Sequence, residues 1–111
     1  MLKKKILIVD DDVISVQMLS AITGRLGFEY QIALSGEDAI KILDKSFDVV
    51  ITDMHMYKVN GNDVARCARD TNCFMCVILC YSPRCIEPEH GLFDHILMKP
   101  LNFKELVVVL T

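Results

Sequence analysis

Five short apolar runs alternate along this chain with segments whose apolar residues recur at helical spacing. The runs cover residues 5–10, 30–34, 48–53, 76–80 and 95–99. Strand-length runs separated by amphipathic helices are typical of an α/β fold with a parallel sheet. The first, third and fourth runs are apolar almost throughout, which predicts strands covered on both faces, whereas the mixed second run suits an edge.

The first predicted helix covers residues 13–26 and ends at Gly27, a residue suited to the left-handed backbone of a helix C-terminus. Apolar residues at three- and four-residue spacing mark the face that we expect to be buried. These residues are Ile14, Met18, Ala21 and Ile22.

A second helix is predicted from the capping box of Ser35 and Asp38 to about Lys45. The residues that it is expected to bury are Ala39, Ile40 and Leu43. A third, shorter helix is marked by the apolar spacing of Val64, Cys67 and Ala68.

The connection between the fourth and fifth runs lacks a helical pattern. Pro83, Pro88 and Gly91 interrupt it, so any helix there is at most a turn or two. The last helix is predicted to be capped by Asn102 with Glu105. Its expected apolar face is formed by Phe103, Leu106, Val107 and Leu110.

Five strand–helix units within 111 residues favour a flavodoxin-like, doubly wound sheet of five parallel strands in the order 2-1-3-4-5. We expect residues 1–111 to form one domain with a degenerate fourth helix and a short last helix. In sheets of this order, ligands bind outside the carboxyl ends of strands 1 and 3.

Composition excludes several classes of function. The formal net charge of −3 gives no basic footprint for nucleic acid. No apolar stretch approaches the length of a membrane span, and the first residues lack the apolar core of a secretory signal. We therefore expect a cytoplasmic domain that contacts neither nucleic acid nor membrane.

The five cysteines are expected to be free, because an odd number without a signal peptide argues against a disulfide framework. Cys73 and Cys76 form a C-x-x-C, but no second pair accompanies it and it leads into a predicted strand. We expect the cysteines to be small buried or half-exposed hydrophobic residues rather than metal ligands. They are Cys67, Cys73, Cys76, Cys80 and Cys85.

Carboxylates follow two strands that the predicted topology makes neighbours. Asp10 and Asp11 finish the first strand, and Asp53 finishes the third. Three carboxylates held together repel one another, and a hard cation such as Mg²⁺, which prefers oxygen ligands, relieves that repulsion. Asp12, the next acid, is expected to cap the first helix.

Lys99 ends the fifth strand and can bring a flexible ammonium group to the same edge, as a point charge for a phosphoryl oxygen. An aspartate, a Mg²⁺ site and a lysine are together the parts needed for phosphoryl transfer to a carboxylate nucleophile.

Three segments in this order and spacing carry a family resemblance: "ILIVDDD", "VVITDMHMYKVNG" and "LMKPL". Over nearly its whole length, the chain resembles a response-regulator receiver domain of two-component signalling. The resemblance implies that Asp53 accepts a phosphoryl group from a phosphohistidine. The donor would be a sensor histidine kinase or a histidine phosphotransfer domain, and the chain would be a signalling phosphoacceptor rather than an enzyme, at most catalysing its own phosphorylation and dephosphorylation.

The resemblance also implies a ligand set and a backbone feature. Asp11 and Asp53 would bind Mg²⁺, with Asp10 helping through water and the backbone carbonyl of His55 as a third protein ligand. Lys99 would contact the phosphoryl group, and the Lys99–Pro100 bond would be cis.

The chain departs from the family pattern where the phosphorylation signal is usually read. Tyr81 stands where a threonine or serine is usual, and a shift of one residue would give that hydroxyl role to Ser82. Ile96 replaces an aromatic residue on the fifth strand, and Tyr57 replaces a proline. We therefore expect the signal to be read near Asp53, through His55, Tyr57 and the loop to Gly61, or not at all, rather than along residues 81–99.

Two other classes of function remain open at this stage. "ILIVDDDVI" also fits the nucleophile motif of haloacid-dehalogenase-type phosphatases, with Asp10 as nucleophile and Asp12 as acid, but the cap and the further acidic pair of those enzymes are absent. The other is a receiver-like interaction scaffold that does not cycle phosphate.

Overall fold

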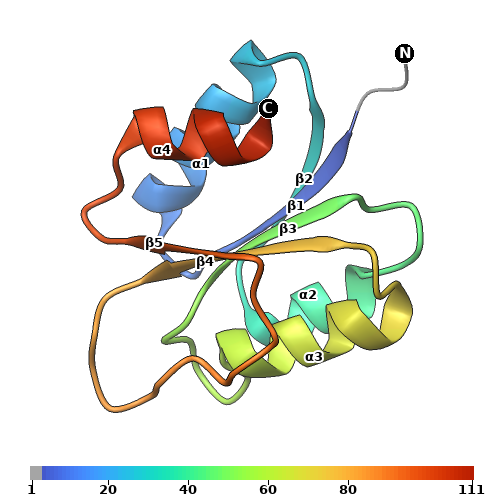
Figure 1. Ribbon diagram of the computed structural model, residues 1–111, viewed down its shortest axis with the longest axis vertical. Helices are drawn as coiled ribbons and strands as arrows, with labels where there is room; N and C mark the ends of the chain where they lie inside the picture. The colour runs from blue at the N-terminus through green and yellow to red at the C-terminus, as the bar shows by residue number, and fades with distance from the viewer. Residues whose placement is uncertain (1–3) are drawn as a thin grey trace.

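The computed structural model describes residues 4–111, and its centre is one parallel sheet (Figure 1). The sheet order is β2-β1-β3-β4-β5, which confirms the predicted flavodoxin-like topology. Its strands are β1 (Lys5–Val9), β2 (Glu29–Ala33), β3 (Val49–Asp53), β4 (Cys76–Tyr81) and β5 (His95–Met98).

Helices cover both faces of the sheet, with α1 and α4 on one side and α2 and α3 on the other (Figure 1). Their bounds are α1 (Val13–Arg25), α2 (Gly36–Ile42), α3 (Gly61–Thr71) and α4 (Phe103–Leu110). Within the described residues, no helix has the length and apolar character needed to cross a membrane.

Side chains of the central strands point alternately to two cores. Ile6, Ile8 and Ile51 pack toward α1 and α4, whereas Leu7 and Val50 pack toward α2 and α3. All five are fully buried. Since β3 is buried along its whole length while most of β2 is exposed, the predicted central and edge strands are confirmed.

The buried face of α1 differs from the predicted one. Ile14 is 66% exposed and Met18 is 44% exposed. The helix instead buries Val16, Leu19, Ser20 and Thr23. Two of these are polar, but their hydroxyls donate to the carbonyls one turn earlier, at 2.6 Å for Ser20 and 2.7 Å for Thr23. The helix backbone therefore satisfies them inside the core, which an apolar pattern cannot anticipate.

Two other helical predictions need correction. The second helix ends at Ile42 rather than near Lys45. Just beyond it the Asp44 carboxylate accepts a hydrogen bond from the Ser46 amide, which favours a turn. Ile40 and Phe103, both expected to be buried, are 38% and 46% exposed.

The chain contains no helix between β4 and β5, as the prolines predicted, and side chains of α3 hold this segment in place. Asn62 donates to the Glu87 carbonyl and accepts from the Glu89 amide, both at 2.9 Å. Arg69 donates to the Leu92 carbonyl at 2.9 Å and forms an ion pair with Asp94 at 2.8 Å. Residues 87–94 therefore run along α3, as Figure 1 shows for the later, darker orange part of the connection.

The start of α3 approaches the end of β3 very closely at Gly61. Its amide donates to the Met54 carbonyl at 3.0 Å, and a Cβ added to Gly61 would lie 2.6 Å from the Asp53 carbonyl oxygen. Asn60 and Asp63 begin the helix with a full capping box, a motif that the sequence analysis did not single out. The absence of a side chain at Gly61 thus sets the distance between α3 and the strand that carries Asp53.

We expect Gly61→Ala to lower the free energy of unfolding by about 1–3 kcal/mol, because an atom must enter space occupied by backbone. Gly24→Ala is the matched control, since a Cβ there would meet its nearest neighbour at 3.6 Å within α1. That change should be neutral or slightly stabilising through helix propensity. Urea unfolding measures both, and equal stability of the two variants would contradict the close approach at Gly61.

Candidate functional site

Three carboxylates meet at the carboxyl ends of β1 and β3. Val9 lies opposite Thr52 in the sheet, so Asp10 and Asp53, the next residues, are neighbours. One carboxylate oxygen from each of Asp10, Asp11 and Asp53 lies within 4.8 Å of the other two. Asp10 and Asp53 are buried, and Asp11 is exposed. The structure therefore brings together the three acids that the sequence placed at strand ends.

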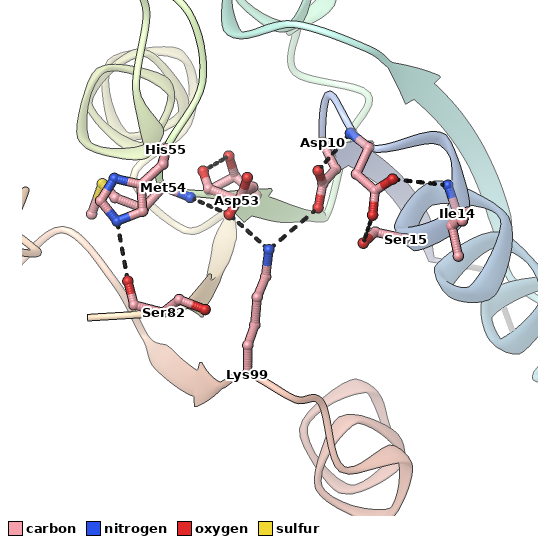
Figure 2. Close-up of polar contacts among 10 residues, drawn as sticks. Asp10, Ile14, Ser15, Asp53, Met54, His55, Ser82 and Lys99 are labelled. Carbon is pink, nitrogen blue, oxygen red and sulfur yellow. Dashed lines mark hydrogen bonds and ion pairs between the residues drawn. The ribbon is translucent and has the colours of Figure 1, made fainter. Parts of the chain in front are cut away.

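Lys99 reaches this cluster from the end of β5 and lies between two of the acids (Figure 2). Its Nζ is 2.9 Å from Asp53 Oδ1 and 3.8 Å from Asp10 Oδ2. Burial opposes the charge on Lys99, but the hydrogen bond and charge of Asp53 outweigh burial, so the pKa of Lys99 is raised. The Lys99–Pro100 peptide bond is cis, as predicted.

The surroundings of Asp10 disfavour the charged form of its carboxyl. Its pKa is raised to about 6, mainly because the carboxyl is buried and in smaller part because of the charge of Asp53. The amide of Asp12, which donates to Asp10 Oδ1 at 2.9 Å, acts in the opposite direction and lowers this pKa. A nearby cation would stabilise the charged form of such a carboxyl. The oxygen-only donor set and the spacing of the three acids fit a hard divalent cation such as Mg²⁺.

The acids open into a cavity of about 490 Å³. It is lined by Asp10, Asp11, Asp12, Asp53, His55, Met56, Tyr57, Arg84, Ile86 and Lys99. A smaller hollow of about 200 Å³ lies between α1 and α4 and shares Asp10 and Lys99 with it. The candidate site is thus a wide polar cavity with an apolar hollow at its side.

Neither of the two predicted hydroxyl residues lines the cavity around Asp53. The Tyr81 hydroxyl donates to the Ile86 carbonyl at 2.8 Å, and its ring stacks on the His55 ring with centroids 6.0 Å apart. The backbone carbonyl of Ser82 lies 3.1 Å from His55 Nε2 (Figure 2). The switch role therefore remains a prediction for both residues, and the hydroxyl of Tyr81 already has a partner elsewhere.

Two polar side chains of the cavity escaped the sequence analysis. The His55 ring was not considered, because only its backbone carbonyl was predicted to act. Arg84 was not considered at all, although it follows a strand that ends at the same edge of the sheet as Asp53. The position of a positively charged residue just after the fourth strand was the sequence signal that could have identified Arg84.

Asp12 has the predicted capping role, and three of the five cysteines are buried or half-buried as expected. Asp12 caps α1, accepting from the Ile14 amide at 3.3 Å. All five cysteines are free, but Cys73 and Cys85 are exposed, contrary to prediction. Burial raises the pKa of Cys80 to about 12, so its thiol stays protonated behind the site. Within residues 4–111, the three acids form the only group of three or more side chains spaced closely enough to hold a metal ion.

The family to which this fold and site belong is shown by comparison with known proteins. The family model for the response regulator receiver domain matches residues 6–111. The chain therefore belongs to the receiver domains of two-component signal transduction. This assignment favours the receiver reading of "ILIVDDDVI" over the phosphatase reading, and Asp12, the acid required by the latter, is used as a helix cap.

Individual relatives agree with the family. The transcriptional regulatory protein CpxR of Escherichia coli (strain K12) is 35% identical over 106 residues, which cover 93% of this chain and 46% of CpxR. The chain thus spans about half the length of this relative.

Solved structures share the fold. A CheY-like receiver domain protein from Methanospirillum hungatei JF-1 has a TM-score of 0.88 at 23% identity, covering 97% of this chain and 90% of that one. The receiver domain of Ssk1 from Saccharomyces cerevisiae, crystallised with the histidine phosphotransfer protein Ypd1, has a TM-score of 0.84 at 19% identity, covering 98% and 87%.

We expect Asp10→Asn to stabilise the protein in the presence of a chelator at pH 7 by about 2 kcal/mol, because it removes a buried charge. Since the pKa of Asp10 rises from 3.8 to about 6 on folding, the wild-type protein should lose this stability as pH increases through that interval. The variant should lack this loss.

Thermal unfolding of wild type and variant from pH 4 to 8 measures the difference. Asp70→Asn is the control, because Asp70 is an exposed carboxylate outside the cluster. If the difference in stability between wild type and Asp10→Asn is constant across this pH range, burial does not raise the pKa of Asp10.

Proposed function

We propose that this chain is the phosphoacceptor of a two-component phosphorelay and takes a phosphoryl group onto Asp53 with the help of Mg²⁺. The observation that carries the proposal is the ion pair of 2.9 Å between Lys99 and Asp53 inside a cluster of three carboxylates. A nucleophile, a cation beside it and a set of hard oxygen ligands are the components of phosphoryl transfer to a carboxylate.

Asp53 and Lys99 have different roles in the proposed transfer. Asp53 Oδ1 accepts from the Met54 amide and from Lys99, both at 2.9 Å, which fixes the carboxylate plane. A carboxylate oxygen of Asp53 then attacks phosphorus as the bond from phosphorus to the donor nitrogen breaks. The donor imidazole leaves with the electron pair of that bond. Lys99 supplies positive charge beside the incoming phosphoryl oxygens.

Asp10, Asp11 and Asp53, with the backbone carbonyl of His55, would hold the Mg²⁺. When bound, this ion neutralises the acids and polarises the phosphoryl oxygens. Without such neutralisation, the carboxylates would repel an anionic donor.

The surface beside the site suits a protein donor. Val13, Ile14 and Met18 of α1 and Phe103 of α4 are large apolar side chains between 44% and 66% exposed. Met18 and Phe103 also line the small hollow that shares Asp10 and Lys99 with the cavity. We propose that a sensor histidine kinase or a histidine phosphotransfer domain packs here, as a partner of the kind with which Ssk1 was crystallised. We propose that the reaction takes place in the cytoplasm and that this domain itself binds neither nucleic acid nor membrane.

A receiver-like scaffold that does not cycle phosphate is the second candidate function. The observation that favours it is the Tyr81 hydroxyl, which is bonded to the Ile86 carbonyl rather than directed into the cavity. The two candidates differ in one measurable property, the uptake of phosphate at Asp53.

We expect the protein to gain one phosphoryl group at Asp53 when incubated with acetyl phosphate and Mg²⁺. Intact-mass and peptide mass spectrometry measure the gain. Asp53→Asn should abolish it by removing the nucleophile, and Asp11→Ala should abolish it by removing a metal ligand while leaving the nucleophile in place. Asp70→Asn, outside the cluster, should label like wild type.

Labelling that persists in Asp53→Asn or in chelator would show that the phosphate is carried elsewhere. A folded wild-type protein that takes up no phosphate and binds no Mg²⁺ would favour the scaffold.

We expect beryllofluoride with Mg²⁺ to shift NMR resonances most strongly over residues 53–61. The reason is that the Tyr81 hydroxyl is held by Ile86, and Ile96 offers no polar atom to report its burial. A ligand shifts an equilibrium only through its differential affinity for the two states. Larger shifts at Ile96 and α4 than at residues 53–61 would contradict this expectation.

A further inference from the structure

The loop after β4 is held at two points around a single arginine. At its start, the Ser82 carbonyl lies 3.1 Å from His55 Nε2. Four residues later, the Ile86 carbonyl accepts from the Tyr81 hydroxyl at 2.8 Å. Arg84 lies midway between these two contacts, immediately after Pro83, whose ring restricts its own backbone. The backbone on both sides of Arg84 is therefore anchored to residues next to the site.

Arg84 lines the same cavity as Asp53 and Lys99. Within the described part of the chain, its guanidinium forms no ion pair, whereas Arg66 and Arg69 of α3 both pair with carboxylates. Four carboxylates and only two side-chain cations, Arg84 and Lys99, line this cavity. Arg84 is thus a cation held at the rim, with its donors available to an incoming group.

Neither the last residue of β4 nor the residue after it contributes a side-chain hydroxyl to the cavity. Tyr81 uses its hydroxyl on Ile86, and Ser82 does not line the cavity. A phosphoryl group on Asp53 would carry three terminal oxygens, and Lys99 is a single point charge. Even with the Mg²⁺ proposed above, Lys99 leaves acceptor positions on these oxygens for a further donor.

We propose that Arg84 binds the phosphoryl group on Asp53 directly, donating from its guanidinium to the phosphoryl oxygens. This inference rests on the proposed function and adds a ligand to the same site. A planar guanidinium matches two phosphoryl oxygens at once, and such charge-assisted pairs are stronger than neutral hydrogen bonds. The contacts of His55 and Tyr81 with the loop act as positioning interactions, because they keep Arg84 over the cavity.

Beryllofluoride binding tests the contact without requiring turnover. In the presence of Mg²⁺, we expect Arg84→Gln to weaken beryllofluoride affinity by about ten- to a hundredfold, the range of a lost hydrogen bond to a charged group. Arg84→Lys keeps the charge but loses the planar guanidinium that can donate two hydrogen bonds at once. Its beryllofluoride affinity should lie between those of Arg84→Gln and wild type. Affinity for Mg²⁺ alone should not weaken in either variant, since neither loses an oxygen ligand. Titration calorimetry measures all of these affinities.

Arg25→Gln is the matched control. It removes one positive charge at the exposed far end of α1, about 18 Å along the helix from Val13. It should bind beryllofluoride like wild type. Thermal unfolding of each variant checks that differences in affinity do not arise from unfolding.

The outcomes separate this inference from the function on which it rests. If wild type binds beryllofluoride and labels at Asp53 while Arg84→Gln behaves like Arg25→Gln, the contact is refuted and the phosphoacceptor function stands. If Arg84→Gln and Arg84→Lys bind beryllofluoride equally weakly, the paired hydrogen bonds of the planar guanidinium, and not its charge alone, make the contact. If folded wild type neither labels nor binds beryllofluoride, both proposals fail.

Discussion

Repulsion among the carboxylates at the ends of β1 and β3 is the constraint around which the rest of the site is arranged. Two of the three acids are buried, and burial alone disfavours their charge. Lys99 partly compensates, with its ammonium 2.9 Å from Asp53 and 3.8 Å from Asp10. The apolar strands that precede these acids hold them in place, so the stability of the core supports a local cluster that would otherwise separate.

The strand order and the acid cluster could be predicted because both follow from position along strands. In a parallel sheet, residues that end neighbouring strands meet at one edge, so Asp10 and Asp53 needed no side-chain detail to be brought together. The buried face of α1 could not be predicted in this way. Ser20 and Thr23 satisfy their hydroxyls on carbonyls of their own helix, and this allows polar residues in the core while Ile14 stays exposed.

Arg84 escaped prediction for a related reason. Its place over the cavity depends on the path of a loop, and that path depends on two contacts between residues of different elements. One of these uses His55, for which the sequence suggested only a backbone role. The other uses Tyr81, whose hydroxyl the sequence analysis considered only as a switch and which donates to the Ile86 carbonyl. Long-range side-chain contacts of this kind leave no periodic signal in a sequence.

The lost fourth helix changes how an event at Asp53 can spread. Side chains of α3, chiefly Asn62 and Arg69, instead form hydrogen bonds with residues 87–94. The same helix begins at Gly61, against the backbone of Asp53. Asp53, α3 and this loop are therefore one connected set of contacts, and the loop returns to the cavity at Arg84. A phosphoryl group that contacted both Asp53 and Arg84 would join two parts of this set. It would favour the conformation in which both contacts form, and this requires no movement of β5.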